Sequence, residues 1–143
     1  MSEFFERSFC TQCEQYSVII EDDGNVCYGY LMDGDQIIGD IWLYNQSLTP
    51  QKTEWKKSEM PLLNTADFFD PRKQPLPIQS RNEINIVFVL SNDFDLLKYA
   101  KIYIRNSLVA ILKPNAKPGW STIVTKDGPL ALKYESNGDI EIK

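Results

Sequence analysis

The most chemically specific spacing in the sequence is Cys10-Thr11-Gln12-Cys13, in which two thiols are separated by two residues. Such a pair can supply two ligands of a tetrahedral zinc ion, or act in redox chemistry at the N-terminus of a helix. The chain contains no histidine, so the other ligands would have to be Cys27 and a carboxylate or a second chain. A strand, not a helix, is expected after the pair. We favour incidental cysteines and predict no metal and no cofactor; zinc ligation by Cys10, Cys13 and Cys27 is the alternative.

Acidic residues occur in four close pairs along the chain. Paired carboxylates serve as acid and base in glycosidases, and dense groups of oxygen ligands bind calcium. The complete Asp-x-Asp-x-Asp-Gly loop of a calcium site is missing. Aspartate is common in turns because its side chain bonds to nearby backbone amides. We therefore favour a structural role for the pairs, which are Asp22 and Asp23, Asp33 and Asp35, Asp67 and Asp70, and Asp93 and Asp95.

The absence of histidine excludes several kinds of enzyme. Neither a Ser-His-Asp nor a Cys-His nucleophile system can be built, and no histidine can act as a general base. The glycine-rich phosphate-binding motifs Gly-x-x-x-x-Gly-Lys-Ser/Thr and Gly-x-Gly-x-x-Gly are also missing, so nucleotide-dependent chemistry is not expected. The sequence favours a protein that is not an enzyme.

Aromatic residues near predicted strand ends and two lysines in a proline-stiffened loop are the candidate binding residues. Exposed aromatic rings can stack on sugars or anchor a protein partner, although core packing is the commoner use of such large side chains. Each of the two lysines comes directly before one of the two prolines in the segment 113–120, where it could bind an acidic group. The candidates are Trp42, Tyr44, Trp55, Trp120, Lys113 and Lys117.

Alternating, β-branched or aromatic runs, separated by turns that contain Gly or Asn, recur along the chain. They predict about nine hairpin-linked strands, which favours an all-β fold, an antiparallel two-sheet sandwich. Residues 93–105 also fit helical spacing, so the alternative is an α+β fold. The predicted strands are 16–21, 26–32, 36–44, 84–90, 99–105, 108–113, 120–126, 130–135 and 139–142.

A proline-rich segment separates the two groups of strands. Residues 46–81 contain five of the eight prolines, and proline removes a backbone donor from a sheet. We predict an ordered, irregular insert that packs over a sheet face, with residues 64–69 as a capped helical turn. The 143 residues are the size of one ordinary domain, so a single domain spanning residues 1–143 is predicted.

The chain is acidic, with a net charge of −5 and a pI near 4.7. This charge argues against nucleic acid or an anionic membrane as a partner. No apolar run approaches the roughly 20 residues of a membrane span, and the first residues are acidic, unlike a signal peptide, so a cytoplasmic location is expected. Residues 1–97 carry 16 acidic and 7 basic residues, whereas residues 98–143 carry 4 and 8. This asymmetry suggests a basic partner for the acidic half, unless folding mixes the two halves.

Three classes of function are compatible with these observations. The leading hypothesis is a small acidic protein-binding or interaction module, such as an accessory or toxin-immunity protein. A carbohydrate-binding β-sandwich with exposed Trp and Tyr rings is the second hypothesis. A carboxylate-based enzyme is the third. Near-coplanar exposed Trp rings would favour the second, and two converging buried carboxylates would favour the third.

Overall fold

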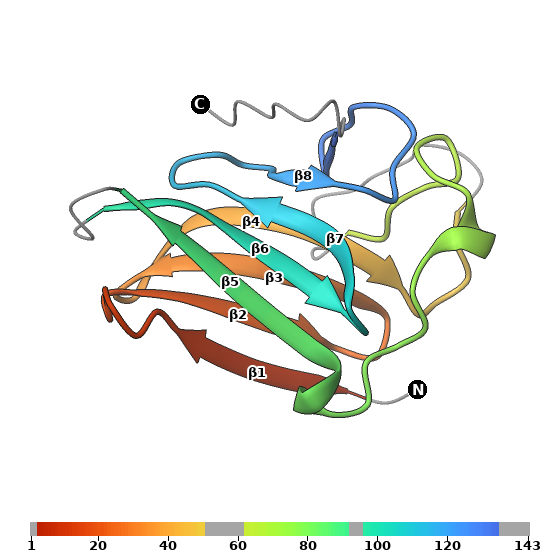
Figure 1. Ribbon diagram of the computed structural model, residues 1–143. Coiled ribbons are helices and arrows are strands. Elements are labelled where there is room, and N and C mark those ends of the chain that lie inside the picture. The colour runs from red at the N-terminus through yellow and green to blue at the C-terminus, as the bar shows by residue number, and fades with distance from the viewer. Residues whose placement is uncertain (1–2, 51–61, 92–95, 135–143) are drawn as a thin grey trace.

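Two β-sheets pack face to face in the computed structural model, which describes residues 3–50, 62–91 and 96–134 (Figure 1). The first sheet is an antiparallel meander in the order β1-β2-β3-β4, and the second has the order β5-β6-β7-β8-β9 with only β8 and β9 parallel. The predicted all-β sandwich is therefore confirmed. The strands are β1 (Phe4–Phe9), β2 (Tyr16–Asp22), β3 (Val26–Asp33), β4 (Gln36–Asn45), β5 (Ile84–Leu90), β6 (Leu97–Ile104), β7 (Ser107–Leu112), β8 (Trp120–Ser121) and β9 (Leu132–Lys133).

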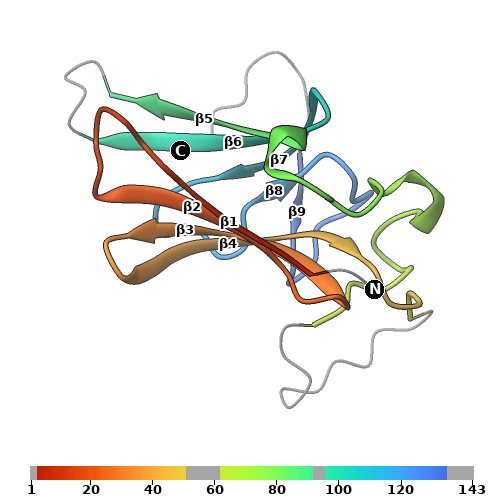
Figure 2. The same ribbon diagram turned by 90° about the horizontal axis from the view of Figure 1, so that it is seen from below.

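The inner faces of the two sheets meet at Gly29 in β3. A Cβ atom at this position would lie 2.9 Å from Cδ1 of Ile102 in β6, so the missing side chain lets the two layers approach closely. Figure 2 shows the two sheets as separate layers. Aliphatic side chains from both layers form one buried cluster; they include Val18, Ile20, Leu31 and Ile41 from the first sheet and Ala100, Ile102, Ile104 and Leu112 from the second.

The sandwich is closed along the β4 edge. The loop between β7 and β8 pairs with β4, because the Asn115 amide donates to the Ile38 carbonyl (2.7 Å) and the Gly119 amide to the Asp40 carbonyl (2.8 Å). The Trp42 amide in turn donates to the Leu130 carbonyl (3.1 Å). The two sheets are therefore joined by backbone hydrogen bonds on this side.

The proline-rich insert covers the outer face of the first sheet with residues 62–69, whereas residues 76–78 contact Arg105 and Tyr44. The Phe69 ring packs on Trp42 with 4.5 Å between ring centroids, and the Tyr28 hydroxyl donates to the Leu62 carbonyl (2.7 Å). Residues 66–68 form a single turn in place of the predicted helical turn over 64–69. Residues 51–61 of the insert, which include Trp55, lie outside the described residues.

The helical alternative for residues 93–105 is wrong in the described part of that range, because Leu97–Ile104 is strand β6 between β5 and β7; residues 93–95 lie outside the described residues. Strands β8 and β9 are much shorter than predicted, and the predicted strand 139–142 lies outside the described residues. Strand β1 is absent from the predicted set. Its inward positions include Glu6 and Ser8, so its apolar residues do not alternate as those of a half-buried strand do.

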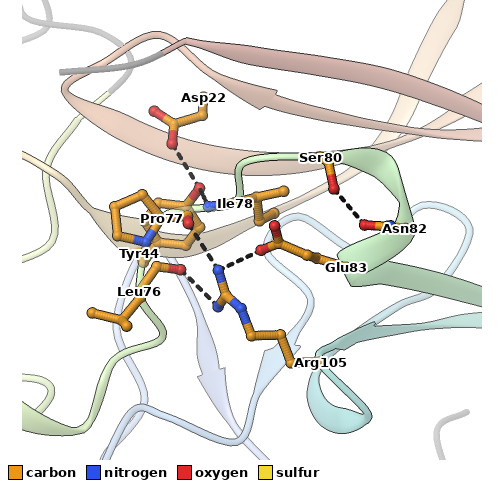
Figure 3. Close-up of polar contacts among 9 residues, drawn as sticks. All are labelled: Asp22, Tyr44, Leu76, Pro77, Ile78, Ser80, Asn82, Glu83 and Arg105. Carbon is orange, nitrogen blue, oxygen red and sulfur yellow. Dashed lines mark hydrogen bonds and ion pairs between the residues drawn. The ribbon is translucent and has the colours of Figure 1, made fainter.

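The turn between β6 and β7 lies one residue earlier than predicted. Its central residues are Arg105 and Asn106, both with positive φ (49° and 68°), rather than Asn106 and Ser107. Arginine rarely adopts this conformation. Here its guanidinium donates to the carbonyls of Leu76 (2.9 Å) and Pro77 (2.8 Å) and pairs with Glu83, which ties the insert to the turn (Figure 3). In the turn between β3 and β4, Gly34 has a positive φ of 59°.

Candidate functional site

The predicted aromatic binding residues on β4 are core residues. Trp42 and Tyr44 are both 0% exposed, so neither ring can form a platform for a sugar or a partner. Their positions explain why: Trp42 faces the insert on the outside of the first sheet, and Tyr44 contacts the buried end of β2. The two rings therefore belong to the core and are not the exposed aromatic rings that were expected.

Tyr44 instead organises a buried polar network, of which Figure 3 draws the contacts with Asp22 and Ile78. Its hydroxyl donates to Oδ2 of Asp22 (2.6 Å) and accepts from the backbone amide of Ile78 in the insert (2.9 Å). Asp22 also accepts from Nε2 of Gln46 (2.7 Å) and from the Gly24 amide (2.9 Å). Burial raises the pKa of Tyr44 far above its usual value, so the phenol remains a neutral donor. This network is structural, because its donors and acceptors satisfy one another.

Three of the other predicted binding residues lie in the described part of the chain, along the segment that leads from β7 into β8. Trp120 is half-buried and pairs with Ile111 on the second sheet. Lys117 lies near Asp40 of the first sheet, where its charge opposes the rise that burial causes in the pKa of that carboxyl. Lys113 is half-buried at the start of the same loop, with its backbone carbonyl turned towards Gly39. Trp55 lies outside the described residues.

The cysteines occupy opposite ends of β2. Cys10 and Cys13 both lie in the connection between β1 and β2, where the Cys10 amide donates to the Tyr16 carbonyl (3.0 Å). Cys27 pairs with Asp22 at the far end of the strand, and burial raises the pKa of its thiol well above its usual value. Within residues 3–50, 62–91 and 96–134, no three Cys, Asp or Glu side chains are grouped as metal ligands would be. The structure therefore does not bring the three candidate zinc ligands together.

A wide opening in the described part of the molecule lies between β1 and β5, opposite the closed β4 edge. These strands end their respective sheets, and neither exchanges backbone hydrogen bonds with a further described strand on its outer edge. A cavity of about 400 Å³ lies between them. Its lining combines polar groups from β1 and the following turn with apolar side chains from β5; it includes Glu6, Ser8, Thr11, Gln12, Asn85, Ile84, Ile86 and Phe88.

The cavity results from a mismatch between the two inner strand faces. Ile84, Ile86 and Phe88 alternate along β5 and point inward, as the pairing of Ile86 with buried Ile102 shows. The inward positions of β1 that oppose them include Glu6 and Ser8, which cannot fill the space as large apolar side chains would. The three apolar residues of β5 are consequently only half-buried.

An ion pair spans this opening. Nε of Arg81, which precedes β5, lies 3.6 Å from Oε2 of Glu6. The Arg81 side chain is 83% exposed, so the pair is solvated and contributes at most about 1 kcal/mol to folding. Among the described residues, Glu6 is the only carboxylate in the cavity lining. The sequence interpretation missed this site, because hydrophobic alternation located β5 but could not show that β5 ends a sheet.

A second, smaller hollow of about 250 Å³ lies at the start of β1. Its acidic lining is already partly bonded, since Asp22 belongs to the buried network and Asp23 accepts from the amides of Asn25 and Val26. These bonds confirm the predicted turn role of the first acidic pair. The hollow is lined by Glu3, Phe4, Phe5, Glu21, Asp22 and Asp23.

Comparison with models of protein families, with curated proteins and with solved structures finds no match to this chain. None of the helices among the described residues is long and apolar enough to cross a membrane.

Proposed function

We propose that the protein is a protein-binding module without enzymatic activity, and that an extended segment of its partner binds in the opening between β1 and β5. The observation that carries this proposal is the cavity of about 400 Å³ between two strands whose outer edges are unpaired within the described residues. Pockets for ligands have volumes of about 300–1,000 Å³. An extended segment can add to an exposed sheet edge, where main-chain hydrogen bonds supply affinity and side-chain pockets supply specificity.

The two sides of the opening suggest how such a segment is held. Its backbone pairs with β5, and every second side chain then points into the cavity. Apolar side chains contact Ile86 and Phe88, whereas Ser8 and Gln12 on the opposite wall offer hydroxyl and amide groups. A partner segment that alternates apolar and polar residues matches this lining. A basic partner, suggested by the acidic first half of the chain, remains part of the proposal.

The observations give less support to the other two hypotheses. A carboxylate-based glycosidase needs two acids on either side of the scissile bond, and the described lining of the cavity contributes one, which is paired with Arg81. A sugar-binding face needs exposed rings, and Trp42 and Tyr44 are buried.

A phage-displayed library of random nine-residue peptides tests the proposal. Peptides selected on the wild-type protein are measured against Ser8→Trp, which fills the cavity, and against the control Ser107→Trp, at an exposed position on β7. We expect at least about tenfold weaker binding to Ser8→Trp, equivalent to about 1.4 kcal/mol, and unchanged binding to the control. No selected peptides, or equal binding to both variants, would overturn the proposal.

Backbone amide shifts of the wild type provide a second measurement, needed if Ser8→Trp does not fold. Adding a selected peptide is expected to shift amide resonances of β1 and β5 and to leave those of β3 and β4 in place. Shifts confined to other strands would contradict the proposed location.

A further inference from the structure

Strand β5 is an edge strand whose pairing with β6 is regular from Ile84 to Val89, with a register shift only before Leu90. Its seven residues, Ile84–Leu90, contain no charged residue and no proline. Natural edge strands commonly carry charges, prolines or bulges that prevent another strand from adding. The other edge strand facing the opening, β1, carries Glu6 and Arg7 and is protected in this way. Val87 on the outer face of β5 is 37% exposed.

We propose that a second copy of the chain pairs with β5, forming a two-fold symmetric dimer in which the two five-stranded sheets become continuous. In an antiparallel register centred on Val87, each Val87 lies opposite its counterpart in the second copy. Ile86 then faces Phe88, and Ile84 faces Leu90. Directly opposite residues point to the same face of a sheet, so inward apolar side chains meet inward apolar side chains.

The charges of β1 disfavour two of its two-fold registers, whereas β5 has no charged residue to restrict its pairing. A two-fold antiparallel pairing of β1 centred on Glu6 or on Arg7 would place like charges directly opposite each other, which is destabilising. Pairing through β5 brings no charged strand residues together. The nearest lysines on the joined sheet are the two copies of Lys101 on β6, three strand spacings or about 14 Å apart, which exceeds the screening length of about 8 Å at physiological ionic strength.

The dimer also covers apolar surface that the single chain leaves half-exposed. Ile84, Ile86 and Phe88 border the open cavity. A second β5 would place its own apolar side chains beside them on the same face of the joined sheet. Isologous pairing uses the same patch on both chains, so the assembly closes at two copies rather than growing into a fibre. The second copy uses the edge to which the proposed partner segment would bind, but this inference does not depend on that function.

Sedimentation equilibrium of the full chain over a dilution series tests the dimer. We expect the mass to rise with concentration towards twice the 16.5 kDa of one chain. Val87→Lys places two like charges opposite each other, so its dissociation constant is expected to increase at least about tenfold. The control Ser107→Lys changes the charge equally at an exposed position on β7 and is expected to dimerise like the wild type.

Mixing two variants tests the register. Val87→Lys and Val87→Glu are each expected to be monomeric, whereas their equimolar mixture recovers the dimer because opposite charges then face each other. A wild type that remains monomeric at every concentration, a Val87→Lys variant that dimerises normally, or a mixture that stays monomeric would each overturn the proposal. If the variants do not fold, hydrogen exchange of wild-type β5 amides decides: protection that does not fall on dilution contradicts the dimer.

Discussion

Asp22 shows how a residue that resembles a surface turn residue can be part of the interior. Its carboxylate is 1% exposed and accepts hydrogen bonds from Tyr44, Gln46 and Gly24. Charge reversal at an exposed turn residue leaves stability almost unchanged. Asp22 does not meet this condition, because its charge is compensated by buried donors that lose their partner when the carboxylate is removed.

Replacing Asp22 with asparagine tests this role. The variant keeps the size of the side chain but turns one acceptor into a donor, which then faces the donors of Tyr44 and Gln46. We expect the free energy of unfolding in urea to fall by about 1.5–3 kcal/mol. Asp35→Asn is the matched control, since Asp35 is exposed in the next turn, and its effect is expected to stay within about 0.5 kcal/mol. Equal effects of the two substitutions would contradict the structural role of the network.

At the scale of the elements, Gly119 and Gly29 allow neighbouring segments to pack closely. The two positions differ in the atoms that an added methyl group would contact. A Cβ at Gly119, before β8, would come closer than van der Waals contact to the Ile111 carbonyl oxygen, which belongs to the backbone of β7. A Cβ at Gly29 would lie 2.9 Å from the terminal methyl of Ile102, which can rotate away. The loop before β8 also pairs with β4 through the Gly119 amide, so the closed side of the sandwich depends on Gly119.

Alanine substitutions at these glycines are expected to have unequal costs. Gly119→Ala must displace backbone, so we expect it to lower the free energy of unfolding by about 3 kcal/mol, whereas Gly29→Ala costs about 1 kcal/mol. Chemical denaturation of both variants measures the difference. A larger decrease in the free energy of unfolding for Gly29→Ala than for Gly119→Ala would contradict this prediction. It would mean that the contact between the two sheets adapts less easily than the junction between β7 and β8.

In the whole molecule, each sheet comes from a different part of the sequence, and the charges remain segregated. Residues 3–46, which form the first sheet, contain nine acidic residues and one basic residue, whereas residues 96–134 contain seven basic residues and one acidic residue. Folding therefore keeps these two charged segments in different sheets; β5, which belongs to residues 1–97 but lies in the second sheet, carries no charge. The acidic and basic layers make one side of the sandwich electrostatically different from the other.

A shared core predicts that the two sheets unfold together. Far-UV circular dichroism reports strands of both layers, and fluorescence reports the three tryptophans, of which Trp42 lies in the first sheet and Trp120 in the second. We expect one cooperative transition in urea with the same midpoint by both methods, as is usual for a single domain of this size. Two separated midpoints would show that the layers are independent folding units, contrary to the predicted single domain.

Elements with local signals could be predicted from the sequence, because alternation and turn residues place β2 to β7 to within a few residues. Burial and open sheet edges could not be predicted in this way, because they depend on contacts between distant segments. Trp42 and Tyr44 are both covered, because β4 has the insert on one face and the second sheet on the other. The opening exists because Glu6 and Ser8 of β1 lie opposite the apolar face of β5, and contact between residues so far apart in the chain leaves no local pattern in the sequence.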